Sequence, residues 1–548
     1  MCGYNRVNGN YSCANTETLN TILKEELAFP GYVVSDFYAV QSTEFANGGL
    51  DMEMPGNQTG GRPFYYGDSL VAAVKNGSVP VDRLNDMAIR IMTPYYLLGQ
   101  DQDFPTPDPS TGAVFASFIL GYQSAQAVAY PAVEARDVRA DHKKVIRKMG
   151  AAGTVLLKNT KGALPLTNET NIGLFGNDAP YPVIGSAATI SQDADGYEMG
   201  TIAVGGGSGT VRSIGLVTPE EAISHHVRKL GGRVQKLFDN NEIVKGLFQT
   251  IYPRPQACLV FLKGFAGEGY DRSSIDLEWN ATAVVEAMAA FCPNTIVVMH
   301  APGMVAMPWA DNENVTAILA AHYPGDESGN ALVDVLWGAV EPSGRLPYSI
   351  PKGEAEYGPP IVDSVANSTD PNAWQVDFTE GQMIDYRQFD ANGTDPLFEF
   401  GFGLSYTTFA MSQNLSVELV NSSLGALPDK AQGTAPGGLV DLWNVVAKVE
   451  VVVTNTGDRA GSVVPQLYVS FPQDHTPAGT LHKVLRGFKK LHLEVGEHRE
   501  VMFELMRRDL SYWDVEGKQW VIPEGTFGFQ AGFSSRDVVA IKQQRIIG

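Results

Sequence analysis

The order of hydrophobic and polar residues divides the chain into segments of different periodicity. Between about 150 and 350, short apolar runs alternate with stretches of helical period. The apolar runs predict strands at 154–158, 172–175, 258–262, 295–299 and 316–319. The stretches between them predict helices at 219–230, 281–291 and 329–337. Strands that are apolar along their whole length and are connected by helices are typical of a parallel sheet covered on both faces.

The segments on either side follow other patterns. Apolar runs predict strands at 31–36 and 49–55, and a helical period covers 80–98. A stretch rich in Pro, Asp and Thr at 100–111 predicts a linker, and a helix ending near Gly150 follows it. After about 440 the helical signal fades, and strands are predicted at β-sandwich spacing over 446–454, 463–471, 486–493, 500–505 and 526–531. The predicted boundaries are 1–95, 96–149, 150–350, an irregular region 351–440, and 441–548.

Charge and composition narrow the classes of partner. The 548 residues include 40 Lys and Arg against 61 Asp and Glu, a formal net charge of −21. An acidic surface disfavours nucleic acids and anionic membranes, and it is compatible with a neutral substrate such as a sugar. No apolar run approaches the ~18 residues of a membrane-spanning helix. No Cys/His group has zinc-ligand spacing, and we expect no cofactor.

Cysteines and glycosylation sequons bear on the compartment. Cys2 and Cys13 bracket a short Gly/Asn-rich turn, so they form either one local disulfide or two free buried thiols. The density of Asn-x-Ser/Thr sequons favours a glycosylated, secreted protein. The sequons lie at Asn10, Asn57, Asn76, Asn168, Asn280, Asn314, Asn367, Asn392, Asn414 and Asn421. The opening residues lack the apolar region of a signal peptide, and we therefore expect an export signal and further sequence upstream of Met1.

Two carboxyl groups are candidates for catalysis. Asp36 ends an apolar strand, at the edge where parallel α/β folds place catalytic groups. Its alternative role is a helix N-cap or a hydrogen-bond acceptor in a loop. Glu268 lies between glycines just after the strand 258–262, and it could act as a general acid if burial raised its pKa. Its alternative role is a solvated loop charge.

The other patterns do not indicate a catalytic or binding site. Arg272 is expected to form a surface ion pair with Asp271 or Asp276. The glycine-rich stretch 205–209 lacks the Gly-Lys-Ser/Thr ending of a phosphate loop, so we interpret it as a sharp turn. The Gly-x-Ser-x-Gly elbow is absent, and the sequence predicts no Ser-His-Asp set.

Motifs in order along nearly the whole chain resemble fungal β-glucosidases of glycoside hydrolase family 3. The segments Met1–Gly9, Gly31–Asp36 and Gly49–Gly56 resemble closing strands of that family's barrel. Five segments resemble the family's second domain: Ala151–Asn159, Gly207–Thr210, Gly267–Tyr270, Pro324–Gly329 and Ser343–Pro347. Two further segments resemble the family's C-terminal region: Phe398–Tyr406 and Arg508–Trp513.

The resemblance implies an architecture and a set of roles. The architecture is an α/β multidomain one: the C-terminal part of a (β/α)8-type barrel, an α/β sandwich with a mostly parallel sheet, and a fibronectin type III-like β-sandwich. Asp36 matches the nucleophile and Glu268 the acid/base. Tyr4 matches a residue of the glycone subsite, while Phe37 and Tyr270 match its aromatic aglycone walls.

The chain also departs from the family's pattern. Phe37 stands where the family usually has Trp, and Gly206 stands where an aromatic residue usually precedes Gly-Ser-Gly. A complete barrel takes ~250 residues, and about 95 precede the linker here. The family's glycone-binding Asp, its Arg and its Lys-His pair belong to strands upstream of the segment matched by Met1–Gly9.

The implied function is a secreted, retaining exo-β-glucosidase that acts on terminal non-reducing β-D-glucosyl residues of cellobiose or other β-glucosides. Its partner is the glycoside substrate, with no nucleic acid or membrane, and the sequence leaves the oligomeric state open. The alternatives are another exo-glycosidase of the family, such as a β-xylosidase, and an inactive fragment. Because the barrel strands here have few partners, we expect Val33, Val34, Leu50 and Met52 to lack most of their burial. We also expect weak hydrogen-exchange protection before residue 95 and negligible activity of the chain alone.

Overall fold

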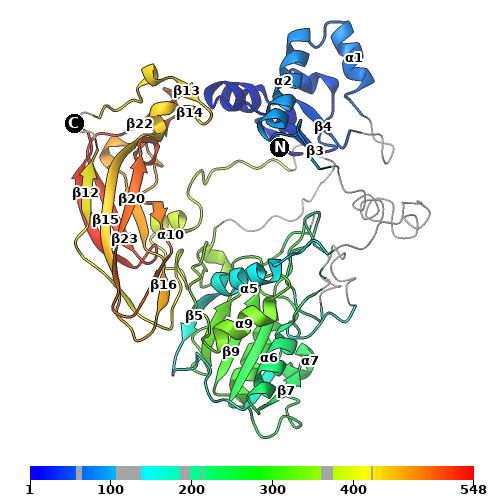
Figure 1. The fold of residues 1–548 in the computed structure, drawn as a ribbon, viewed down its shortest axis with the longest axis vertical. Coiled ribbons are helices and arrows are strands. Elements are labelled where there is room, and N and C mark those ends of the chain that lie inside the picture. Colours follow the sequence, from blue (N-terminus) through cyan, green and yellow to red (C-terminus); the bar gives the residue numbers. More distant parts are fainter. Residues whose placement is uncertain are drawn as a thin grey trace. The chain divides into compact units, whose positions relative to one another are not determined.

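The chain divides into two compact units in a computed structural model. The model describes residues 1–56, 64–105, 137–184, 198–211, 213, 215–268, 270–358, 369, 374–420 and 424–547. The first unit comprises Met1–Asp137, Leu427–Asn444 and Met506–Arg508, and the second unit comprises the remainder. Figure 1 shows the blue elements of the N-terminal region and the sheet that follows them in cyan and green.

A six-stranded sheet forms the centre of the second unit. Its strands are β5 (Val155–Asn159), β6 (Asn171–Phe175), β7 (Arg233–Leu237), β8 (Ala257–Lys263), β9 (Thr295–His300) and β10 (Val315–Ala320). Their order is β5-β10-β9-β8-β6-β7, and only the β5–β10 pair is antiparallel. All residues of β8, β9 and β10 are buried, which confirms the mostly parallel, doubly covered sheet that the apolar runs predicted.

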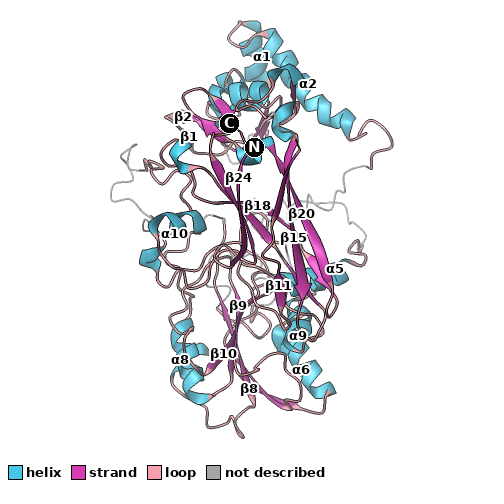
Figure 2. Cartoon of the chain, turned by 90° about the vertical axis from the view of Figure 1, so that its left-hand side faces the viewer, coloured by secondary structure: helices cyan, strands magenta, loops and turns pink. Residues whose placement is uncertain are grey.

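Helices cover both faces of this sheet. They are α5 (His142–Gly153), α6 (Pro219–Lys229), α7 (Asn240–Val244), α8 (Ala281–Phe291) and α9 (Ser328–Leu336). Figure 2 shows α8 on one side of β8–β10, and α6 and α9 on the other. The strand β7 was not predicted from the sequence, because Arg-Val-Gln-Lys-Leu is a mixed pattern that suits the half-exposed edge of the sheet.

The second unit continues into a β-sandwich. One sheet contains β11 (Phe409–Met411), β15 (Val445–Asn455), β12 (Ser416–Leu419) and β20 (His498–Met506). The other contains β18 (Val484–Phe488), β17 (Gln466–Ser470), β23 (Thr526–Gly532) and β24 (Val538–Arg545). Shorter elements of the second unit are α10 (Tyr386–Asn392), β16 (Gly461–Val463), β19 (Leu491–Leu493), β21 (Tyr512–Asp514) and β22 (Gln519–Val521). Along β15, alternate residues are buried, as expected for a strand with one face on a core.

The predicted start of the sandwich at 441 is wrong. Two strands from the region expected to be irregular, β11 and β12, pair antiparallel with successive stretches of β15: β11 with Val453–Asn455 and β12 with Ala447–Glu450. Both are only three or four residues long, too short to give a periodic signal of their own. Their pairing with an eleven-residue strand supplies the missing stabilisation.

Parallel strand pairing organises the start of the first unit. The strand β3 (Val34–Phe37) pairs in parallel with β4 (Met52–Met54). On its other side Cys2 forms a parallel bridge with Ser35, and the Asp36 N–H donates to the Cys2 carbonyl over 2.9 Å. Both edges of β3 are therefore satisfied by neighbouring backbone. Other elements of this unit are β1 (Arg6–Val7), β2 (Asn10–Tyr11), a π-helical segment Glu17–Glu26, α1 (Asp68–Lys75) and α2 (Val81–Leu97). The stretch Leu427–Asn444 adds the short strands β13 (Thr434–Ala435) and β14 (Gly438–Leu439).

A buried carboxylate links these elements. The Asp51 side chain is fully buried and accepts from Lys24 Nζ at 2.9 Å and from Arg83 Nη2 at 2.6 Å. The Val33 N–H donates to its other oxygen at 2.7 Å. Lys24 lies in the π-helical segment and Arg83 in α2, so one charge connects two helices to the strand pair. A buried charge is tolerated because its partners replace the lost hydration.

The sequence predicted that Val33, Val34, Leu50 and Met52 would lack most of their burial. This prediction is wrong for two of these four residues. Val33 is 3% exposed and Leu50 is fully buried, whereas Val34 and Met52 are half-buried. Helical segments of the same unit cover the first pair, since Leu19, Phe45, Ala73 and Met87 share one cluster with them. The sequence argument counted only the strands and omitted the helices that pack beside them.

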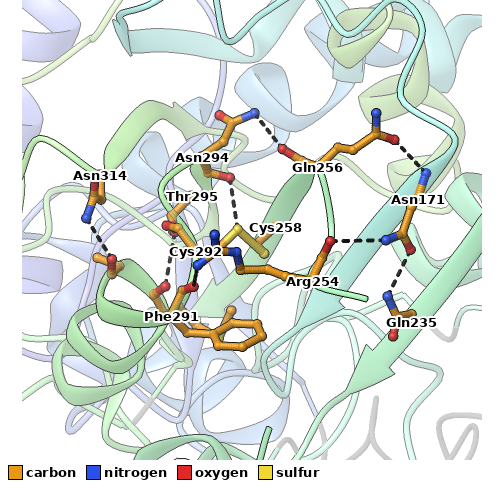
Figure 3. The surroundings of a disulfide bond; sticks show 12 residues. Asn171, Gln235, Arg254, Gln256, Cys258, Phe291, Cys292, Asn294, Thr295 and Asn314 are labelled. Atoms are coloured by element: carbon orange, nitrogen blue, oxygen red, sulfur yellow. Dashed lines mark hydrogen bonds between the residues drawn. A yellow bond between two sulfur atoms is a disulfide. The ribbon is translucent and has the colours of Figure 1, made fainter. Parts of the chain in front are cut away.

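All four cysteines form disulfides. Cys2 and Cys13 are joined, as one of the two sequence interpretations proposed. A second disulfide joins Cys258 in β8 to Cys292 after α8 and was not predicted. Figure 3 shows it beside a polar network in which the Asn171 side chain donates to the Arg254 carbonyl.

Removing the charge of Asp51 should destabilise the first unit. Asp51→Asn leaves Lys24 buried without its carboxylate partner and removes the buried one of the two carboxylates that pair with Arg83, and we expect a loss of about 3–5 kcal/mol. Hydrogen exchange of peptides covering β3 and β4 measures this loss. Asp86→Asn is the control, because Asp86 pairs with Arg83 and Arg90 with its side chain 42% exposed, and an exposed pair contributes at most about 1 kcal/mol. Equal protection in both variants would contradict a central role for Asp51.

Candidate active site

Asp36 is placed by β3 at the end of a short parallel strand. Its side chain is half-buried, and its Oδ1 accepts from the Phe37 N–H at 2.7 Å. No helix begins at this position, so the helix N-cap alternative is wrong. Tyr38, with φ at 63°, turns the chain away immediately after the strand. The carboxylate therefore lies at the carboxyl end of the strand, the position that the sequence predicted.

The aromatic candidates of the first unit differ in exposure. Tyr4 is 60% exposed. Phe37 is half-buried and meets the Tyr38 ring edge-on at 6.3 Å between centroids. Cys2 pairs in parallel with Ser35 of β3. Tyr4 comes two residues after Cys2 and Phe37 two residues after Ser35, so both aromatic residues lie just beyond this bridge on neighbouring segments.

Glu268 belongs to the loop after β8 and is held by a second loop. Gly267 forms a parallel bridge with Gly206, and the Glu268 N–H donates to the Gly206 carbonyl at 3.3 Å. The Ser208 N–H donates to Glu268 Oε2 at 2.7 Å. Glu268 itself is exposed, and no lysine or arginine of the described residues forms an ion pair with it. Backbone donors orient this carboxylate while leaving it accessible.

The glycines of the second loop allow this close approach. Gly207 has φ at +107°, and a β-carbon there would lie 2.4 Å from Glu268 Cβ. The stretch 205–209 is thus a turn, as predicted, and the turn serves as the seat of Glu268. A β-carbon at Gly206 would lie 3.0 Å from the ring of Phe265, so Phe265 fills the space beside the position where the family usually has an aromatic residue.

Tyr270 lies on the other side of the Glu268 loop. It is half-buried, and its ring contacts the Phe265 ring at 5.2 Å between centroids. Phe265 and Ile202 form a small buried cluster against which Tyr270, Trp279 and Tyr323 pack. The cluster connects the loop of Glu268 to the segment that precedes Gly206.

The local environment lowers the pKa of Glu268. Hydrogen bonds from Ser208 stabilise the ionised form, and their effect exceeds that of desolvation. The condition for a general acid, a pKa raised by burial, is therefore not met in the second unit by itself, because the carboxylate is exposed there. A general acid at this position needs further enclosure before it holds a proton near neutral pH.

Two further expectations are corrected. Arg272 forms no ion pair with Asp271 or Asp276. Its guanidinium instead donates to the Met304 carbonyl at 3.0 Å and the Asp276 carbonyl at 3.3 Å. A hydrogen-bonded Ser-His-Asp set does exist, formed by Ser328, His300 and Asp178. Its members lie 28 and 122 residues apart, a spacing that no local motif reports.

The structure brings the predicted residues together in two groups. Tyr4, Asp36 and Phe37 belong to the first unit, and Glu268 and Tyr270 belong to the second. Among the sequons, Asn57, Asn367 and Asn421 lie outside the described residues. Within the described part of the chain, no cluster of three or more His, Cys, Asp or Glu could hold a metal ion. No described helix is both long and apolar enough to cross a membrane.

Family models match both parts of the second unit. Residues 154–406 match the glycosyl hydrolase family 3 C-terminal domain. Residues 463–535 match a fibronectin type III-like domain. The first match covers the six-stranded sheet and the loop of Glu268, and the second covers most of the sandwich.

Curated fungal relatives match nearly the entire chain. "Probable beta-glucosidase G" of Aspergillus terreus is 48% identical over 98% of the chain, which spans 66% of that relative's length. "Probable beta-glucosidase L" of Neosartorya fischeri is 41% identical over 98% of the chain and is covered over 69% of its own length.

Solved structures agree with these matches. The β-D-glucoside glucohydrolase of Trichoderma reesei superposes with a TM-score of 0.85 at 36% identity, over 100% of this chain and 72% of its own. The β-glucosidase of Chaetomium thermophilum gives a TM-score of 0.87 at 33% identity, over 99% of this chain and 73% of its own. Identity of this extent, over both units and in the same order, shows that the chain belongs to glycoside hydrolase family 3.

Proposed function

We propose that this chain carries the two catalytic carboxyl groups of a retaining exo-β-glucosidase. Asp36 is the nucleophile that attacks the anomeric carbon, and Glu268 is the acid that protonates the departing oxygen and then the base that activates water. The observation that carries the proposal is the seating of Glu268: its exposed carboxylate accepts from the Ser208 N–H, and its own N–H donates to the Gly206 carbonyl. The named activities of the fungal relatives support β-glucosides as the substrate class.

The mechanism requires the two carboxyl groups to differ in protonation. Retention needs them ~5–5.5 Å apart, with one ionised and the other protonated. Asp36 Oδ1 accepts from the Phe37 N–H, which orients the carboxylate. Glu268 has its pKa lowered by Ser208 in the free second unit. Substrate binding that excludes water from Glu268 would disfavour its charged form, so that the carboxylate takes up a proton from solvent. Glu268 then donates this proton to the leaving oxygen in the first step.

Aromatic side chains supply the binding surfaces in this proposal. Tyr4 contributes to the glycone subsite, while Phe37 and Tyr270 flank the aglycone. Sugar rings stack on aromatic faces because their C–H groups are apolar. A phenyl ring at 37 offers less stacking area than an indole, so we propose a wider tolerance for aglycones than a tryptophan would give.

We also propose that the protein is extracellular. Its four cysteines are all paired in disulfides, which persist in oxidising compartments. Six sequon asparagines are exposed in the described residues: Asn10, Asn76, Asn168, Asn280, Asn392 and Asn414. Surface exposure of the acceptor amide is what a glycan requires.

The catalytic roles are tested by substitution at both carboxyl groups. Because the chain spans 66% of the A. terreus relative, each variant is made in the 548-residue chain and in a chimera. The chimera joins to the chain the portion of that relative that the chain does not match, in the order in which the relative carries it. We expect the chimera to hydrolyse an aryl β-glucoside in preference to the aryl β-xyloside, and the chain alone to be at least ~100-fold slower.

In the chimera, Asp36→Asn should abolish turnover because no nucleophile remains. Glu268→Ala should slow poor leaving groups by ~10²–10⁴-fold and spare good ones, which need no protonation. Azide should partly restore Glu268→Ala by attacking the glycosyl-enzyme. Wild-type rates of Glu268→Ala on poor leaving groups would refute its role as acid. Faster turnover of the xyloside would favour the β-xylosidase alternative.

Adding one methyl group beside Glu268 should impair the same reaction. A β-carbon at Gly207 would meet Glu268 Cβ at 2.4 Å and occupy an unfavourable φ, so Gly207→Ala must displace the carboxylate. A displacement of ~1 Å is expected to reduce kcat/KM by about 100-fold. Gly209→Ala is the matched control, because nothing lies within 4 Å of its β-carbon and its φ is ordinary. Equal rates of the two variants in the chimera would contradict the proposed seating.

Glycan mapping tests the extracellular proposal. Secreted from a eukaryotic host behind a heterologous signal peptide, the chain should carry glycans at Asn76, Asn168 and Asn392. Asn314 should be unmodified, because it is half-buried and its Nδ2 donates to the Ala289 carbonyl at 3.0 Å. Mass spectrometry of peptides after enzymatic deglycosylation in heavy-oxygen water distinguishes the sites. A fully occupied Asn314 with bare Asn76 and Asn168 would contradict this assignment.

A further inference from the structure

A chain of three buried polar side chains lies at the carboxyl edge of the six-stranded sheet. Asp178 Oδ2 is 2.5 Å from His300 Nδ1, and Ser328 Oγ is 3.0 Å from His300 Nε2. Asp178 follows β6, His300 ends β9 and Ser328 begins α9. With Nδ1–H donating to the carboxylate, Nε2 accepts from the serine hydroxyl, so each member has a partner.

Burial excludes a second hydrolytic centre here. The three side chains resemble a nucleophile, base and carboxylate in their connectivity. All three residues are 0% exposed, so no substrate reaches the Ser328 hydroxyl. A fully satisfied buried network instead fixes the relative positions of the elements that carry it.

The network reaches the backbone of the segment that seats Glu268. The Ile202 N–H donates to Asp178 Oδ1 at 2.9 Å, and Thr201 Oγ1 donates to the Asp178 carbonyl at 2.7 Å. The Gly325 N–H, three residues before Ser328, donates to the Ala203 carbonyl at 3.0 Å. Asp178 therefore binds the segment 200–208 directly, and Ser328 is linked to it through Gly325, whose carbonyl accepts from the Ser328 N–H at 3.1 Å.

A buried lysine reinforces the same segment. Lys263 is 1% exposed, and its Nζ donates to the Gly200 carbonyl at 2.5 Å and the Asn177 carbonyl at 3.4 Å. Burial lowers the pKa of Lys263 to about 8, and the charges of Asp178, Glu198 and Glu278 oppose that effect. Lys263 is the last residue of β8, five positions before Glu268.

The segment 200–208 then contacts Glu268 directly. Ile202 and Phe265, both fully buried, pack together in one cluster. The Gly206 N–H donates to the Ala266 carbonyl at 3.0 Å, and Ser208 reaches the carboxylate. A continuous set of hydrogen bonds and contacts thus runs from His300 to the oxygen of Glu268.

We propose that Asp178, His300 and Ser328 are positioning residues that hold the segment 200–208 so that the Ser208 N–H stays against the Glu268 carboxylate. Their effect on catalysis rests on the proposed function of Glu268. Their effect on the Ser208–Glu268 hydrogen bond does not, and this bond is therefore the quantity to measure. Breaking the network should free the segment and release the carboxylate from its donor.

The test uses variants of the full 548-residue chain. His300→Leu removes both hydrogen bonds, and His300→Asn retains a donor toward Asp178 at the position of Nδ1. Ser328→Ala removes a single hydroxyl. If His300→Leu does not fold, Ser328→Ala is the variant that tests the proposal. Val298→Ala is the matched control, because Val298 is a fully buried residue of β9 two positions before His300 and lies outside the network.

Two readouts report on the hydrogen bond. The first is the titration of Glu268, followed by NMR of ¹³C-labelled glutamate and identified by the signal missing in Glu268→Gln. Loss of the Ser208 donor should raise the Glu268 midpoint, most in His300→Leu and least in His300→Asn. The second is hydrogen exchange of the peptide containing Ser208, which should become about tenfold faster in His300→Leu.

The outcomes are decisive in both directions. Val298→Ala should leave the Glu268 midpoint and the Ser208 exchange unchanged, even where it lowers the stability of the unit. Unchanged readouts in His300→Leu and Ser328→Ala would overturn the proposal, and so would equal changes in Val298→Ala. Inactivity of the Asp36 and Glu268 variants tests the proposed function separately, because neither readout here requires turnover.

Discussion

The parallel pairing of β6, β8, β9 and β10 is the constraint on which the second unit depends. Strands that run in one direction bring their carboxyl ends to one edge, and the chain must leave that edge through loops. Asp178, Lys263 and His300 all lie at or just after those ends. The same constraint places the loop of Glu268 beside the segment 200–208, although 60 residues separate Ser208 from Glu268.

Buried charges specify the geometry of both units. Asp51 in the first unit and Lys263 in the second are almost fully buried, and each binds backbone groups from other segments. Burying such a charged group costs free energy, and this cost is offset only where well-placed partners form hydrogen bonds with it. In the first unit the charge connects helices to strands, and in the second it connects a strand to the segment beside the acid/base candidate.

The two candidate carboxylates occupy different surroundings. Asp36 is half-buried on a strand whose two edges are paired, so its backbone has little freedom. Glu268 is exposed on a loop and is held by donors from another loop. In the proposed mechanism, Asp36 needs a fixed position from which to attack, whereas Glu268 must both release and accept a proton.

The sequence by itself determined the local chemistry of this protein. Apolar runs predicted the strands of the parallel sheet, and glycines around Glu268 predicted a loop that permits close approach, because these features depend on neighbours along the chain. Tertiary structure decided the rest. The edge strands β7, β11 and β12 have weak patterns and exist through their pairing, and Val33 and Leu50 are buried by helices that no strand pattern reveals. The Asp178–His300–Ser328 network joins residues up to 150 positions apart, which only the convergence of strand ends brings within hydrogen-bond distance.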